Sequence, residues 1–219
     1  MFKQVSQALQ ATTRWLGYAQ TCPLCNSKLT SNQQLICLAC YQALPWQTAP
    51  AKQAATPLHS AFTYASPIKE LILAGKNSQS LDKIQLLASL LQQEFPKFIT
   101  ELPEAILPVP LHPKRLRQRG FNQSVELVRP LAKNLGLPLL LTPIIRQRHT
   151  DEQKKLAATA RQHNLERAFQ LISPISYQHV AIFDDVVTTG ATCAELEALL
   201  IDHGVEKIQI WCCAQTKMT

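Results

Sequence analysis

The 219-residue sequence has no long hydrophobic run, and it has no acidic residue between Met1 and Lys69. No apolar stretch approaches the roughly 20 residues that a membrane-spanning helix needs. The N-terminus, MFKQVSQALQ, also lacks the continuous apolar segment of a secretory signal peptide. We therefore expect a cytoplasmic protein without a membrane span. Its first residues are predicted to form a packed helix, since apolar side chains recur there on one helical face.

Acidic residues are scarce in a second region, because Glu126 is the one acid between Ala105 and Thr150, against eight lysines and arginines. The net charge of +7 is therefore concentrated in two basic regions. Such local positive fields favour polyanionic partners, either pyrophosphate groups or nucleic acid. For the N-terminal region, a basic surface that only keeps the protein soluble is an equally good explanation. The hydrophobic content of 46% and the charged fraction of 17% exclude a largely disordered chain.

Four of the seven cysteines form two C-x-x-C pairs separated by eleven residues. They are Cys22, Cys25, Cys37 and Cys40. Four thiolates can close a tetrahedral shell around one ion, and Zn²⁺ is the metal expected at such a site without redox chemistry. Two disulfides are the alternative, which a reducing cytoplasm disfavours. The spacing thus predicts a structural zinc ribbon. Cys193, Cys212 and Cys213 lack ligand spacing and are predicted to be buried small apolar residues.

A segment rich in alanine, glutamine, proline and threonine, Pro45–Pro57, predicts a linker. We place an N-terminal helix and zinc ribbon at 1–50 and a second domain at 58–219. Apolar runs in the second domain predict strands at 58–64, 105–109, 144–146, 168–172, 180–183 and 207–213. Helical periodicity predicts helices at 81–95, 122–135 and 191–201. We expect an α/β fold in which a parallel sheet is flanked by helices.

The strand predicted at 105–109 runs into P-L-H-P-K-R-L-R-Q-R-G-F-N-Q at 110–123. Because its prolines prevent a continuing strand, we interpret this cationic block as a mobile, electropositive loop. In an α/β sheet it lies at the carboxyl end of its strand, where pyrophosphate or a DNA backbone could be bound. The candidate contacts are Lys114, Arg115, Arg117 and Arg119. A solvated basic loop is the alternative.

The stretch V-A-I-F-D-D-V-V-T-T-G-A-T at 180–192 joins an apolar run, two carboxylates and a hydroxyl-rich loop before a predicted helix. A strand that enters a helix through such a turn presents backbone N–H groups and the positive helix end to an anion. Asp184 and Asp185 repel phosphate, but they suit a ribose diol or a bound Mg²⁺. The loop adds hydroxyl donors and one glycine that permits close approach: Thr188, Thr189, Thr192 and Gly190. We interpret the stretch as a cradle for ribose 5-phosphate, and an ordinary strand–turn–helix is the alternative.

The nine residues D-D-V-V-T-T-G-A-T resemble the phosphoribosyl-pyrophosphate (PRPP) signature of type I phosphoribosyltransferases. In that family the two acids contact the ribose hydroxyls and the loop binds the 5-phosphate. The resemblance implies catalytic roles for Asp184 and Asp185 and Mg²⁺ bound together with PRPP. It also implies phosphate binding by Val187, Thr188, Thr189, Gly190, Ala191 and Thr192.

Nearly the whole chain resembles the ComF family, also called ComFC or GntX-like proteins. The resemblance depends on the four cysteines, the cationic block, the residues Gln153, Arg161, Asn164 and Phe169, and the acid-rich loop, in that order. The family is similar to type I phosphoribosyltransferases in fold, with an N-terminal zinc ribbon added. Its members are linked to natural transformation and to incoming single-stranded DNA in the bacterial cytoplasm. The segment T-D-E-Q-K-K-L-A-A-T-A-R departs from the family pattern, because it is less rich in proline and has acids at 151–152.

The resemblance implies a ComF-type protein that handles single-stranded DNA and binds a PRPP-like ligand. A competence helicase or the translocation machinery would be its protein partner. An active phosphoribosyltransferase with an unknown acceptor and a PRPP-sensing regulator without catalysis are the alternatives. Because the residues specify no acceptor base or amine, binding of PRPP is better supported than transfer of its ribosyl group.

Overall fold

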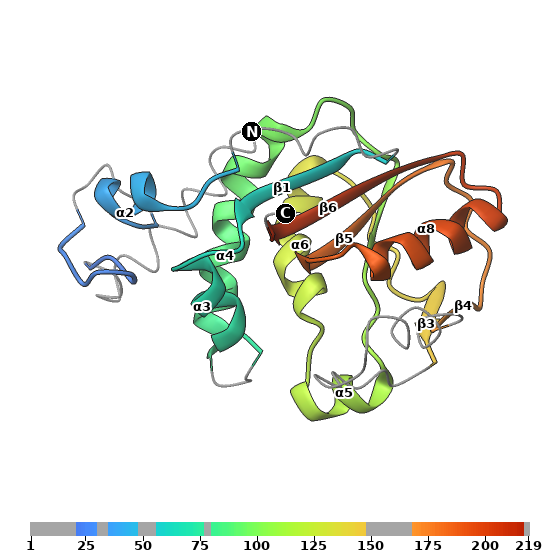
Figure 1. Cartoon of the computed structure of the whole chain (residues 1–219), viewed down its shortest axis with the longest axis horizontal. Helices are drawn as coiled ribbons and strands as arrows, with labels where there is room; N and C mark the ends of the chain where they lie inside the picture. Colours follow the sequence, from blue (N-terminus) through green and yellow to red (C-terminus); the bar gives the residue numbers. More distant parts are fainter. Residues whose placement is uncertain (1–20, 30–34, 48–55, 77–79, 148–167, 217–219) are drawn as a thin grey trace. The chain divides into compact units, whose positions relative to one another are not determined.

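The structure is a computed structural model that describes residues 21–29, 35–47, 56–76, 80–147 and 168–216 (Figure 1). The chain divides into two compact units, Met1–Leu44 and Pro45–Thr219. The first contains helix α2 (Leu38–Ala43) and the four paired cysteines. The helix expected at the N-terminus and the segment 149–164 lie outside the described residues. Within the part of the chain that is described, no helix is long and apolar enough to cross a membrane.

The second unit is built on a four-stranded sheet with the order β1-β6-β5-β2. Its strands are β1 (Leu58–Thr63), β6 (Lys207–Gln215), β5 (His179–Val187) and β2 (Ala105–Pro108). All three pairings are parallel, so the carboxyl ends of the strands meet at one edge of the sheet. The predicted fold class, a parallel sheet flanked by helices, is confirmed. β3 (Ile144–Arg146) and β4 (Phe169–Leu171) form a separate antiparallel pair.

Helices cover both faces of this sheet, which explains why its strands read as continuous apolar runs. They are α3 (Ile68–Ala74), α4 (Leu81–Glu94), the 3-10 helix η2 (Phe95–Phe98), α6 (Gln123–Leu135) and α8 (Ala191–Asp202). On one face, Val180 and Ile182 of β5 pack with Leu196 of α8 in a single buried cluster. On the other, Trp211 of β6 contacts Phe95 of η2, with ring centroids 5.3 Å apart. Figure 1 shows α8 on its own and α3, α4 and α6 grouped together.

The cationic block contains a helix, so the expectation of a mobile loop is wrong. Pro113–Arg119 forms α5, in which Pro113 takes a first-turn position where its missing N–H costs nothing. The ring Nδ1 of His112 accepts a hydrogen bond from the N–H of Lys114 at 3.2 Å and caps the helix. Gly120 ends it with a left-handed φ of 79°. The prolines do end β2 at Pro108, but the lysine, leucine and arginines that follow are good helix formers.

Asn122 links the start of α6 to the end of β2. Its Oδ1 accepts from the N–H of Ser124 at 3.0 Å, while its Nδ2 donates to the carbonyl oxygen of Val109 at 2.9 Å. Loss of both interactions in Asn122→Ala should lower the free energy of unfolding by about 1–3 kcal/mol, measured by urea titration. Asn122→Asp keeps the cap acceptor but lacks the amide donor, so it should lose less. An alanine variant as stable as the wild-type protein would contradict this role.

Candidate functional site

Asp184 and Asp185 lie inside β5 rather than after its end. The strand continues past Phe183, its predicted last residue, because pairing with β6 extends to Val186 opposite Ala214 and Val187 opposite Gln215. Strand pairing therefore fixes the backbone on both sides of the two acids. Both acids stand at the carboxyl edge of the sheet.

Two donors hold the side chain of Asp184. The hydroxyl of Ser124, in the first turn of α6, donates to Oδ1 at 3.3 Å, and the N–H of Asp185 donates to the same oxygen at 2.8 Å. Loss of hydration, and then repulsion from Asp185, raises the pKa of Asp184 well above its usual range. Asp185 in turn accepts at Oδ1 from the N–H of Val186 at 2.9 Å. A bound cation would compensate the charge of this acid pair, and a sugar diol would donate hydrogen bonds to it.

The residues after β5 form a tight turn into α8. Gly190 is the N-cap of that helix, with a left-handed φ of 76° and no side-chain cap. Thr188 and Thr189 are exposed, and Thr189 Oγ1 accepts from the N–H of Ala191 at 3.4 Å. A Cβ atom at position 190 would meet nothing within 4 Å, so the glycine is needed for its backbone angle and leaves open space beside the turn. Such a turn at the start of a 12-residue helix can bind a phosphate group.

The end of β6 anchors this turn from behind. The N–H of Thr216 donates to the carbonyl oxygen of Val187 at 3.1 Å. The hydroxyl of Thr216 donates to the carbonyl oxygen of Thr188 at 3.4 Å. The side chain of Val187 is buried. Of the predicted phosphate-binding residues, Val187 therefore has a packing role for its side chain, whereas the two threonines after it face solvent.

The cations of α5 divide between two faces of the helix. Arg115 and Arg119, one turn apart, are half-buried, whereas Lys114 and Arg117 are exposed. The helix follows β2, which is paired with β5, and the N–H of Val109 donates to the carbonyl oxygen of Phe183 at 2.8 Å. The cationic block therefore leaves the sheet next to the strand that contains the acid pair.

Arg146, the last residue of β3, was missed by the sequence-based prediction. Its guanidinium carbon lies 5.3 Å from the ring centroid of Phe169, its partner in β4. Burial lowers the pKa of Arg146, repulsion from Arg115 lowers it further, and attraction to Asp184 and Glu195 raises it. These charges come from α5, β5 and α8. Its only signal in the sequence is a cation at the end of a short apolar run.

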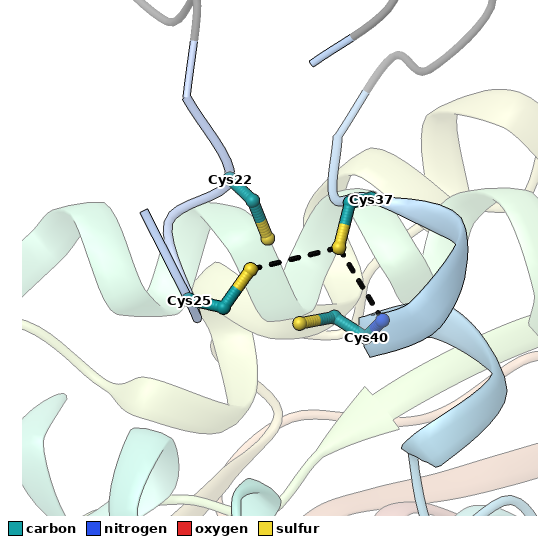
Figure 2. A group of neighbouring side chains, drawn as sticks. All are labelled: Cys22, Cys25, Cys37 and Cys40. Carbon is teal, nitrogen blue, oxygen red and sulfur yellow. Dashed lines mark hydrogen bonds between the residues drawn. The ribbon is translucent and has the colours of Figure 1, made fainter. Parts of the chain in front are cut away.

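The four paired cysteines are gathered in the first unit, and Figure 2 shows their thiols facing one another. The four sulfur atoms lie within 4.8 Å of one another, and all seven cysteines of the chain are free. Cys37 is the N-cap of α2, and its Sγ accepts from the N–H of Cys40 at 3.4 Å. Hydrogen bonding with Ser27 lowers the pKa of Cys25 to about 6, which favours the thiolate that a metal ion needs. The cluster can hold a metal ion such as zinc.

The three remaining cysteines are buried, as predicted. Cys193, Cys212 and Cys213 are each at most 1% exposed, and burial raises the pKa of Cys212 to about 12. These thiols pack in the second unit as small apolar side chains.

Solved structures of phosphoribosyltransferases are similar to the chain, with low TM-scores. Adenine phosphoribosyltransferase from Leishmania tarentolae has a TM-score of 0.40 and 12% identity, with 77% of this chain and 95% of that chain covered. Glutamine PRPP amidotransferase from B. subtilis has a TM-score of 0.38 and 15% identity, with 64% and 26% covered. The fold class follows from the sheet itself, with its acid pair at the carboxyl edge.

Sequence relatives identify the family, although no protein-family model matches the chain. The DNA utilization protein YhgH of Salmonella typhimurium is 38% identical over 200 residues, covering 89% of this chain and 84% of that protein. YhgH of Escherichia coli (strain K12) is 36% identical over 200 residues, which again cover 89% of this chain and 84% of that protein. Competence protein F of Haemophilus influenzae is 44% identical over 114 residues, 51% of this chain and 50% of that protein. The chain belongs to the ComF family, together with YhgH and competence protein F.

The metal content of the purified full chain tests the cysteine cluster. We expect about one zinc per chain by elemental analysis, because four thiolates close a single tetrahedral shell. Cys37→Ala should lose the metal, whereas Cys213→Ala, which removes a buried thiol outside the cluster, should retain it. A folded wild-type protein without metal, or equal metal loss in both variants, would refute the zinc assignment.

Proposed function

We propose that this ComF-family protein acts in DNA uptake or DNA utilisation and binds PRPP, or a closely related phosphoribosyl ligand, at the carboxyl edge of its sheet. The observation that carries the ligand assignment is the acid pair of β5, followed directly by the glycine-capped start of α8. The biological assignment is supported by the relatives named for DNA utilization and competence. We further propose that the protein works in the cytoplasm on single-stranded DNA, with a competence helicase or the translocation machinery as its partner.

Each part of a phosphoribosyl ligand has a matching group in this arrangement. The 5-phosphate would accept hydrogen bonds from the N–H groups and hydroxyls of residues 188–192, with the positive end of α8 behind them. The ribose hydroxyls would donate to Asp185 and Asp184, the latter already oriented by Ser124. Mg²⁺ would be bound with the ligand, since carboxylates and phosphate oxygens are its preferred partners. In the first unit, a zinc ion at the four cysteines would stabilise the ribbon.

DNA binding is supported by the exposed basic residues of α5. Lys114 and Arg117 are exposed on α5, where they could neutralise phosphates of a DNA strand. Half-buried Arg115 and Arg119 could serve either a pyrophosphate group or DNA. The two roles predict different salt dependence, because contacts to a DNA backbone release counterions.

An active phosphoribosyltransferase is the second candidate. It is favoured by the cations of α5, the helix that follows the strand paired with β5, since charge that builds on departing pyrophosphate would be stabilised there. If PRPP is bound and no acceptor in a broad panel consumes it, the protein is instead a PRPP-sensing regulator.

Titration calorimetry of the full chain with PRPP, with and without Mg²⁺, tests the ligand assignment. We expect binding that is tighter with Mg²⁺ and at least about tenfold weaker in Asp185→Asn, because the variant loses a charged acceptor. Asp202→Asn, an equal change of charge at the exposed far end of α8, should bind like the wild-type protein. Absence of PRPP binding to the wild-type chain would rule out the proposal.

Electrophoretic or fluorescence titration with a labelled single strand tests the DNA assignment. Affinity should fall steeply with salt, and Lys114→Glu combined with Arg117→Glu should weaken it at least about tenfold, because two phosphate contacts are lost. Lys133→Glu is a control for charge reversal elsewhere on the chain, since it reverses one exposed charge in the last turn of α6 and should weaken binding much less. If the wild-type chain binds no single strand at low salt, DNA handling by this chain is excluded.

A further inference from the structure

Cys25 differs from the other six cysteines in its access to solvent. All seven lie among the described residues, and Cys25 is the exposed one, whereas five are buried and Cys40 is half-buried. The three thiols of the second unit are at most 1% exposed, so they are shielded from a reagent in solution. Oxidation of the folded chain should therefore begin at Cys25, because oxidants attack accessible thiolates first.

A second thiol lies directly beside Cys25. The Sγ atoms of Cys25 and Cys37 are 3.6 Å apart, and Figure 2 shows the two thiols facing each other across the cluster. The two residues belong to different C-x-x-C pairs, and Cys37 is the N-cap of α2. The sulfur atoms would have to approach by about 1.5 Å to reach the bond length of a disulfide. An accessible thiol with a second thiol beside it is the arrangement found in redox-sensing sites.

Hydrogen bonds on both sides hold these two sulfur atoms near each other. The hydroxyl oxygen of Ser27 lies 3.0 Å from Sγ of Cys25. The N–H of Cys22 donates to the carbonyl oxygen of Ser27 at 2.7 Å, which closes the turn that contains Cys25. On the other side, Sγ of Cys37 accepts from the N–H of Cys40 at 3.4 Å. The turn and the start of α2 therefore present the two thiols to each other before any reaction.

We propose that Cys25 and Cys37 form a redox-sensitive modification site, at which hydrogen peroxide converts two thiolates into a disulfide. The Cys25 thiolate attacks the peroxide, so that an S–O bond forms, the O–O bond breaks and hydroxide leaves. The Cys37 thiolate then attacks the sulfur of Cys25, which forms the S–S bond and expels a second hydroxide. The two sulfur atoms together lose two electrons, and one peroxide is reduced to two hydroxides.

The disulfide removes two of the four ligands from the cluster. Cys22 and Cys40 remain, and two thiolates do not close a tetrahedral shell, so the metal is released. The first unit then loses the folding energy that a structural metal supplies. The second unit is a separate compact part of the chain with buried thiols, and it is left intact. This inference goes beyond the proposed function, because it concerns the first unit and involves no phosphoribosyl ligand.

Treatment of the reduced full chain with hydrogen peroxide tests this site. Peptide mass spectrometry should identify Cys25–Cys37 as the first disulfide, and a chromogenic chelator should detect about one zinc released per disulfide, because the shell is broken. Dithiothreitol should reverse the disulfide. Cys37→Ser should leave Cys25 as a sulfenic acid, with at least about fivefold more labelling by dimedone than in the wild-type chain. Cys213→Ala, which removes a buried thiol, should react like the wild-type chain.

Each outcome supports or overturns the proposal. A first disulfide between any other pair of thiols overturns it, as does oxidation of Cys25 beyond the sulfenic acid without a disulfide. Thiols that survive peroxide at a concentration that oxidises a free cysteine peptide also overturn it. Should Cys37→Ser not fold, the disulfide mapped in the wild-type chain decides alone. A purified chain without zinc would refute the metal assignment, but the mapped disulfide would still decide this inference.

Discussion

Two adjacent carboxylates held at the end of a paired strand are the constraint on which the rest of the site depends. β5 stays bonded to β6 through Val187, so the backbone cannot move the acids apart or turn them away. Like charges at this separation are unfavourable without compensation. The fold supplies it locally through the hydroxyl of Ser124, and Asp184 also attracts Arg146 at longer range.

The parallel topology explains why the compensating groups come from distant parts of the chain. All four strands of the sheet end at the same edge, so the segments that follow β2 and β5 begin next to each other. The segment after β2 forms cationic α5 and then reaches α6, whose first turn contains Ser124. The segment after β5 forms the turn at Gly190 and then α8. Anion-binding and acidic groups are thereby collected at one edge, which favours a ligand with both phosphates and hydroxyls.

The sequence allowed prediction of the elements whose signals are local. Val180–Phe183 is a continuous apolar run, and Gly190 stands where a left-handed turn must precede a helix, so β5 and the start of α8 could be foreseen. α5 was missed because its prolines and charges resemble a loop, although Pro113 is favourable at the start of a helix. Arg146 could not be found, because its position depends on pairing with β4 and on charges distant in the sequence.

A structure of the full chain with PRPP and Mg²⁺ tests the central claim most directly, because it locates each end of the ligand. The account predicts the 5-phosphate at the amide groups of residues 188–192 and the ribose hydroxyls at Asp185. A ligand bound elsewhere on the chain, or one whose 5-phosphate lies away from the turn before α8, would contradict it.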